Sequence, residues 1–164
     1  MNENEIGTIV VDCAVELHRD LGPGLLETVY EVTLARALER RGLSVQRQAG
    51  VTIEYRGERF EEGFRADLIV RSLVIVESKS VERVTPAHKK QVLTYLRLTG
   101  LKLGYLLNFG EALMRDGITR IIWGNLDPNP PCLGVSVREE FIEPDGPPNA
   151  VEPRRSVLAF EWGN

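Results

Sequence analysis

Apolar residues recur at helical spacing in three segments of the chain. In residues 4–19 they fall at every third or fourth position, with charged residues mostly between them. A second segment, residues 26–38, follows the helix-breaking Gly22-Pro23-Gly24. The third begins at Thr85-Pro86, a preferred helix start, and ends at Gly100. The pattern therefore predicts three helices that pack through one apolar face.

Between the second and third helices the apolar period changes to two, which is typical of β-strands. The alternating segments cover residues 45–55, 60–70 and 73–76. They predict an antiparallel meander. Beyond the third helix, residues 101–108 and 118–123 predict two buried strands, with a turn at Asp116-Gly117 between them.

Three charged residues interrupt the apolar runs of the meander: Asp67, Glu77 and Lys79. Charges inside buried strands cost free energy unless something compensates for them. Period two places Glu77 and Lys79 on one face of their strand. A three-residue loop between the strands would pair Val70 with Val74. It would then set Asp67 opposite Glu77, whereas a two-residue loop would send the two acids to opposite faces.

The two acids and the lysine allow two interpretations. Two carboxylates held ~5 Å apart across strands repel each other, and a hard divalent cation such as Mg²⁺, which prefers oxygen ligands, relieves that repulsion. Alternatively, the three charges form a structural ion pair network. The chain has only four lysines among its 20 basic residues, and one of them stands in an apolar strand beside an acid. The spacing alone leaves both interpretations open.

Composition narrows the class of protein. A chain of 164 residues with 43% hydrophobic content suits one compact domain. No apolar run reaches transmembrane length and the polar start is no signal peptide, so we expect a cytoplasmic protein. The residues Cys13, Cys132, His18 and His88 do not fall at zinc-ligand spacing, and Cys13 is expected in the core. The net charge of -4 argues against non-specific electrostatic binding of nucleic acid.

Two helices carry further candidates. Glu27 falls in the first turn of the second helix and Tyr30 lies one turn on; an acid there can simply stabilise the helix dipole, by ~0.3–1 kcal/mol. On the third helix, His88, Gln91 and Tyr95 form one polar stripe. That stripe is either a solvated face or a row directed at phosphates, and spacing alone favours the solvated face.

The C-terminal part differs in composition from the rest. Seven of the nine prolines lie between Pro128 and Pro153. Alternating apolar residues, which predict short edge strands, occur at Val135 and Val137 and again at Leu158, Phe160 and Trp162. We expect an extension that packs on the domain or on a partner.

The order of these elements resembles the core of the PD-(D/E)xK nuclease superfamily, with Asp67 on one strand and Glu77-Ser78-Lys79 on the next. Gln91 to Tyr95 is similar to the QxxxY motif of its RecB-like and Cas4-like branch. The segment Gly24 to Tyr30 resembles the GxxExxY signature of a small family placed in that superfamily. Ala66 stands where the superfamily motif has a proline. The similarity spans roughly residues 6–123.

The resemblance implies an α/β (α+β) restriction-endonuclease-like core, with a central mixed β-sheet flanked by helices. The nuclease-like domain would be residues 1–124, followed by the Pro-rich extension at residues 125–164. The implied activity is hydrolysis of phosphodiesters in nucleic acid with Mg²⁺ or Mn²⁺, DNA being favoured over RNA. The protein would not associate with membranes and could form a homo-oligomer.

The resemblance also assigns the site residues. The catalytic residues would be Asp67, Glu77, Lys79 and Glu27. The metal ligands would be Asp67, Glu77, Glu27 and the Ser78 backbone carbonyl. The substrate-binding residues would be Gln91, Tyr95, His88 and Tyr30.

Two other functions compete with a nuclease. One is a non-catalytic module that keeps the nuclease fold to bind nucleic acid or protein; the intact set of Asp67, Glu77 and Lys79 argues against it. In the other, the same three charges are purely structural and the C-terminal extension makes the protein's contacts.

Overall fold

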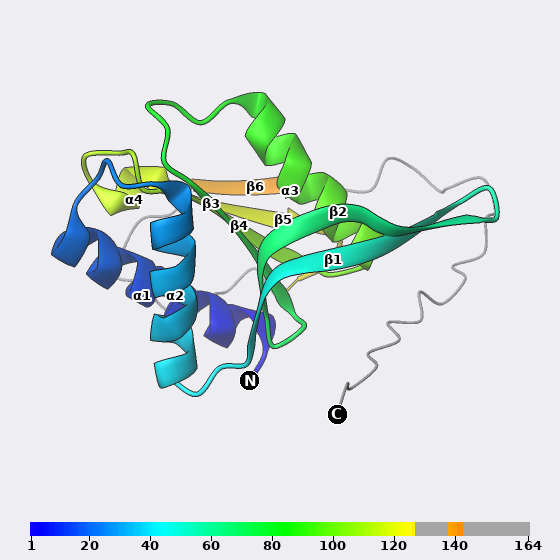
Figure 1. The fold of residues 1–164 in the computed structure, drawn as a ribbon, viewed down its shortest axis with the longest axis horizontal. Helices are drawn as coiled ribbons and strands as arrows, with labels where there is room; N and C mark the ends of the chain where they lie inside the picture. The colour runs from blue at the N-terminus through cyan, green and yellow to red at the C-terminus, as the bar shows by residue number, and fades with distance from the viewer. Residues whose placement is uncertain (127–137, 143–164) are drawn as a thin grey trace.

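A six-stranded sheet with strand order β1-β2-β3-β4-β5-β6 forms the centre of the computed structural model, which describes residues 1–126 and 138–142 (Figure 1). The strands are β1 (Val45–Tyr55), β2 (Glu58–Val70), β3 (Val74–Lys79), β4 (Leu103–Asn108), β5 (Ile118–Trp123) and β6 (Arg138–Ile142). The helices are α1 (Glu3–Leu21), α2 (Glu27–Arg40), α3 (Pro86–Thr99) and the short α4 (Met114–Gly117). Because β3 pairs parallel with β4 while β1, β2 and β3 form an antiparallel meander, the sheet is mixed, and the predicted fold class is confirmed.

Helices cover both faces of the sheet. One core cluster joins α1 and α2 to the sheet and the other joins α3 to it, and Figure 1 shows the helices on the two sides. Val76 of β3 lies in the first cluster and its neighbour Ile75 in the second. Since side chains alternate along a strand, Glu77 and Lys79 follow Ile75 towards the side of α3.

The predicted ends of the third helix are confirmed, and Asn2 adds a cap that was not predicted. The Asn2 side chain accepts a hydrogen bond from the backbone of Glu5 at 2.9 Å and begins α1. Thr85 is the N-cap of α3, with Pro86 as its first residue. Gly100 ends that helix with a φ of 73°, in the left-handed region where glycine has no side chain to clash.

The turn between β2 and β3 has three residues, 71–73, and pairs Val70 with Val74. The three-residue alternative is therefore the one that the protein adopts. Arg71 and Ser72 both have positive φ, at 49° and 55°. From this turn the ladder continues to Leu68 opposite Val76 and pairs no residue beyond that point.

The β1–β2 hairpin is irregular opposite this point. The pairs on either side are Arg47 with Leu68 and Ala49 with Ala66, but Gln48 and Asp67 between them are not paired. Gln48 has a φ of 48°. Leu68 packs in the cluster of α1 and α2 whereas Ala66 packs in the cluster of α3, although alternate residues of a regular strand share a face. The alternation of side chains along β2 therefore shifts at Asp67, so Ala66 and Leu68 point to opposite faces of the sheet.

The predicted turn at Asp116-Gly117 is wrong: these residues end the short helix α4. The Asp116 N–H bonds to the Leu113 carbonyl at 3.0 Å, which closes a helical turn. Gly117 then comes so close to β4 that a side chain there would lie 2.2 Å from the Asn108 carbonyl oxygen. This close approach leaves no room for a side chain at position 117.

Strand β6 comes from the Pro-rich part of the chain and pairs parallel with β5 at the edge of the sheet. The edge strands predicted around Val135 and Val137 and from Leu158 to Trp162 lie outside the described residues. Cys13 is buried, as predicted. In residues 1–126 and 138–142, no helix combines the length and the apolar character needed to cross a bilayer.

Candidate active site

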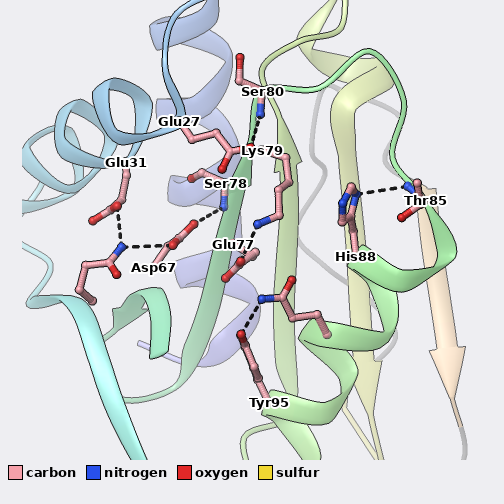
Figure 2. A network of polar contacts seen from close by, with 12 residues as sticks. Glu27, Glu31, Asp67, Glu77, Ser78, Lys79, Ser80, Thr85, His88 and Tyr95 are labelled. Carbon is pink, nitrogen blue, oxygen red and sulfur yellow. Dashed lines mark hydrogen bonds and ion pairs between the residues drawn. The ribbon is translucent and has the colours of Figure 1, made fainter. Parts of the chain in front are cut away.

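The candidate site lies where β2 separates from β3. Past the last ladder pair, the Asp67 carboxylate replaces the missing backbone partner: its Oδ2 accepts the Ser78 N–H at 2.9 Å. The Asp67 side chain therefore reaches β3 just past the point where the two strands stop pairing (Figure 2).

Glu77 and Lys79 meet on the adjacent strand. The Glu77 side chain is only 3% exposed, and its Oε1 accepts a hydrogen bond from Lys79 Nζ at 2.8 Å (Figure 2). Its other oxygen, Oε2, is buried without a hydrogen-bond partner among the described residues. A buried carboxylate oxygen without a partner is costly, so Glu77 has an unfilled capacity to bind a donor or a cation.

The acids of this site are harder to ionise than usual. Burial raises the pKa of Asp67, against the effects of the Ser78 N–H and the Lys79 charge. Burial also raises the pKa of Glu77, and the charge of Asp67 raises it further, while Lys79 opposes both. Each acid would become easier to ionise if more positive charge were brought between them.

Lys79 keeps its proton at neutral pH. Burial lowers its pKa, but the hydrogen bond to Glu77 and the charges of Glu77, Asp67 and Glu27 outweigh burial, so the pKa is raised overall. An ammonium group has three donors. With one of them on Glu77, the Lys79 ammonium can donate to two further acceptors.

Glu27 reaches the end of β3 through the backbone. Its Oε1 accepts the Ser80 N–H at 3.1 Å, and Ser80 Oγ donates to the Leu25 carbonyl at 2.7 Å. These bonds fasten the start of α2 to the residue after Lys79. Across the described ranges, no three His, Cys, Asp or Glu side chains are grouped closely enough to hold a metal ion, so Glu27 does not join Asp67 and Glu77 in one cluster.

Gln91 and Tyr95 of α3 face the site from the other side. Gln91 Nε2 donates to the Tyr95 hydroxyl at 2.6 Å (Figure 2). The Tyr95 ring stacks on Phe64 at 3.9 Å between centroids. Burial raises the pKa of Tyr95, and the charge of Glu77 contributes to the shift. His88 lies a turn away, where its Nδ1 accepts the Thr85 N–H at 3.3 Å.

Tyr30 lies in the core. The residue is fully buried, its ring stacks on Phe109 at 4.3 Å, and its hydroxyl donates to the Gly22 carbonyl at 2.6 Å. The same hydroxyl accepts the Leu25 N–H at 3.1 Å. Tyr30 therefore holds the turn between α1 and α2, and its hydroxyl is not directed at a substrate.

Sequence reasoning missed Glu31 and Gln48. Gln48 Nε2 donates both to Glu31 Oε2 at 2.7 Å and to Asp67 Oδ1 at 3.2 Å. Glu31 is 4% exposed, and Arg47 Nε donates to its Oε1 at 3.0 Å. The position of Glu31, four residues after Glu27 and hence on the same side of α2, was a usable signal. Nothing in the sequence pattern indicated Gln48.

Asn108 was also missed. This fully buried residue accepts the Val81 N–H at 3.0 Å and donates to the Val81 carbonyl at 2.9 Å. It thereby fixes the loop that follows Lys79. A lone amide at the end of an apolar strand is a weak signal for such a role.

A protein-family model, that of the PD-(D/E)XK nuclease superfamily, matches residues 4–121 of the sequence. The chain belongs to this superfamily. Asp67 and the Glu77-Ser78-Lys79 triplet, which the sequence resemblance assigned to the acid, the second acid and the lysine of the PD-(D/E)XK pattern, lie within the matched residues. Comparison with curated proteins and with solved structures gave no match.

Nucleases of the superfamily generally use divalent metal ions. The residues of this site fit such an ion, because Asp67 and Glu77 offer the carboxylate oxygens that hard cations prefer. The unpartnered Oε2 of Glu77 is a ready ligand atom.

Proposed function

We propose that the protein is a metal-dependent nuclease that hydrolyses phosphodiester bonds at Asp67, Glu77 and Lys79. The observation that carries the proposal is the buried Oε2 of Glu77, which has no hydrogen-bond partner in the described structure although it belongs to a charged group. It lies on a carboxylate whose pKa is raised by burial and by Asp67. Two such acids beside one ammonium group carry an excess of negative charge that suits a bound cation.

Asp67, Glu77 and the Ser78 backbone carbonyl are the proposed ligands of Mg²⁺ or Mn²⁺. When bound, the ion would supply a water of lowered pKa and stabilise negative charge on the phosphate. Asp67 is prepared for this role because the Ser78 N–H already fixes one of its oxygens. Glu27 would act from the edge of the site, through its bond to the Ser80 backbone.

Lys79 would position the attacking water or the scissile phosphate. Its ammonium is held in place by Glu77 and stays charged, since its pKa is raised. The two N–H groups of Lys79 that are not bonded to Glu77 can donate to acceptor oxygens of a bound substrate. A compact ammonium suits this task better than a guanidinium, whose donors are fixed in a planar fork.

Gln91 and Tyr95 would contact the substrate backbone from α3. Because the Tyr95 hydroxyl accepts from Gln91, its own proton remains to be donated. His88 would take part through Nε2, as its Nδ1 is engaged at the helix start. We leave Tyr30 out of the substrate-binding set because its hydroxyl is used within the core.

The finer assignment rests on motifs. The segment Gly24 to Tyr30 supports membership of the GxxExxY family, and Gln91 to Tyr95 supports the RecB-like and Cas4-like branch. We further propose nucleic acid as the substrate, with DNA preferred to RNA, and a cytoplasmic protein that can form homo-oligomers.

A cleavage assay tests the proposal. Labelled single- and double-stranded DNA and RNA are incubated with the full chain in Mg²⁺, in Mn²⁺ and in a chelator. We expect metal-dependent cleavage that Glu77→Ala and Lys79→Ala each abolish. Glu39→Ala and Lys102→Ala, which change exposed residues of the same types, are the matched controls and should cleave like the wild type.

Cleavage that survives both site substitutions would reject this active site. Binding of nucleic acid without cleavage, in the presence or absence of metal, would favour the non-catalytic module instead.

A further inference from the structure

Gln48 has a backbone conformation that strands seldom contain. It lies inside β1, yet its φ is 48°, in the left-handed region that disfavours residues with a side chain. It also leaves the hairpin ladder, since no pair joins Gln48 to Asp67. Unfavourable backbone conformations persist where the surrounding structure enforces them, and they cluster at functional sites.

The side chain of Gln48 joins two carboxylates. Its Nε2 lies 2.7 Å from Glu31 Oε2 and 3.2 Å from Asp67 Oδ1 (Figure 2). Both partners are acceptors, so the amide nitrogen rather than the amide oxygen must face them. Glu31 is buried on α2 and is held in turn by Arg47, which fixes the far end of the bridge.

The consequence is that both oxygens of Asp67 are held. Gln48 donates to Oδ1, and the Ser78 N–H donates to Oδ2 at 2.9 Å. Each carboxylate oxygen has two lone pairs, so each keeps one for another partner after these bonds are made. The rotation of the carboxylate is thereby fixed without using up its capacity to bind a cation.

We propose that Gln48, held by Glu31, is a positioning residue that aims the Asp67 carboxylate into the site. The proposal rests on the proposed function, in which Asp67 is a metal ligand. Partners that orient a metal ligand typically contribute 10- to 100-fold to metal affinity or activity. The left-handed backbone of Gln48 is then required because it turns the amide out of the ladder and towards Asp67.

Replacement by glycine separates positioning from stability. Gln48→Gly removes the amide but suits the positive φ, so the backbone gain offsets part of the cost of leaving Glu31 without this donor. The melting temperature should therefore fall less than in Gln48→Ala. The affinity for Mn²⁺, measured by electron paramagnetic resonance on the full chain, should fall about 10- to 100-fold. A crystal structure of this variant should show the Asp67 carboxylate rotated away from the Ser78 N–H.

The matched control is Gln46→Gly. This exposed glutamine lies two residues earlier on β1, is not among the positive-φ residues and pairs with Ile69. Glycine there should lower the melting temperature and leave Mn²⁺ affinity unchanged. Only Gln48→Gly should therefore weaken Mn²⁺ binding.

An unchanged Mn²⁺ affinity in Gln48→Gly, or an Asp67 carboxylate that stays on the Ser78 N–H, would overturn the inference. Neither measurement needs a substrate, so a wild-type protein that binds Mn²⁺ but cleaves nothing would reject the nuclease and leave this comparison valid. If the wild type binds no Mn²⁺, the crystal structures of wild type and Gln48→Gly decide: a rotated carboxylate supports positioning, and an unmoved one refutes it.

Discussion

Two polar clusters with buried members occupy different parts of this sheet, and they differ in charge. At the β5 cluster, Arg120 is fully buried and donates to Glu139 Oε1 at 2.9 Å and to Asn4 Oδ1 at 2.5 Å. One guanidinium there meets one carboxylate and one neutral amide, so the charges balance. The cluster fastens the start of α1 and the edge strand β6 to the sheet.

The cluster around Asp67 does not balance. Three carboxylates, those of Asp67, Glu77 and Glu31, meet two cations, Lys79 and Arg47. The pKa values of Asp67 and Glu77 are both raised, with burial as the main cause. Arg120 Nε in the first cluster and Glu77 Oε2 in the second are both buried without a hydrogen-bond partner in the described structure, but only Glu77 Oε2 lies amid excess charge. We therefore base the proposed site on uncompensated charge and not on the burial of polar groups alone.

The largest expected effect is on activity. Glu77→Gln removes the excess charge and a proposed ligand while keeping the shape of the side chain. Cleavage should fall by at least about 100-fold, whereas the free energy of unfolding at pH 7 should be unchanged or higher. Initial cleavage rates and urea unfolding measure the two quantities, with Glu39→Gln as the control. A Glu77→Gln protein with a lower unfolding free energy but normal cleavage would show that the Asp67 cluster stabilises the fold and does not carry out cleavage.

The next effect is on stability, at the balanced cluster. Arg120→Ala leaves Asn4 and Glu139 without their buried partner and should reduce the free energy of unfolding by about 3 kcal/mol, the lower end for a broken buried pair because Glu139 is partly exposed. Urea unfolding checks the value. The folded fraction should still cleave nucleic acid. A loss under about 1 kcal/mol, the range of surface pairs, would show that the cluster is dispensable.

The pH dependence of stability should separate the clusters further. For Asp67 and Glu77 the folded pKa lies above the unfolded value of about 4. The folded state then binds these protons more tightly, so their contribution to stability is greatest at low pH and is lost as pH rises from about 4 through the raised folded pKa.

The double variant Asp67→Asn/Glu77→Gln should lack this loss. Its unfolding free energy relative to wild type should therefore increase as the pH is raised from 4 to 8, and Mg²⁺ should reduce the difference by stabilising the wild type alone. Urea unfolding across that pH range is the measurement. A difference that stays constant with pH would mean that the two acids are not strained in the folded state.

The smallest expected effect concerns the start of α2, beside the acid-rich cluster. Leu26 is the N-cap of α2, makes no capping bond with its side chain and is 74% exposed. Leu26→Ser should raise the unfolding free energy by about 1 kcal/mol, because serine can cap the helix. Leu26→Ala should give no such gain. Equal melting temperatures for the two variants would show that the helix start is satisfied in another way.

Much of the fold was predictable because local rules and tertiary packing agree. The start of α3 at Thr85-Pro86 and its end at Gly100 follow from capping alone. The alternation of apolar residues located β3 and placed Glu77 and Lys79 on one face. The length of the turn before Val74 could not be chosen from sequence, because a loop of two or three residues fits the same pattern.

The rest of the site depends on contacts between segments far apart in the chain. Gln48 takes a left-handed conformation that its residue type does not predict, and it meets Glu31 only because α2 packs beside β1. Tyr30 has the same spacing whether it faces a substrate or the core, and packing on Phe109 decides for the core. Side-chain direction at such positions is set by the assembled fold.

A crystal of the full chain soaked in Mn²⁺ tests the central claim most directly. We predict an anomalous-scattering peak bonded to both Asp67 and Glu77, with Glu77 Oε2 among its ligands. A well-diffracting crystal at saturating Mn²⁺ that shows no peak between these two carboxylates, or shows the ion only elsewhere, would contradict the account.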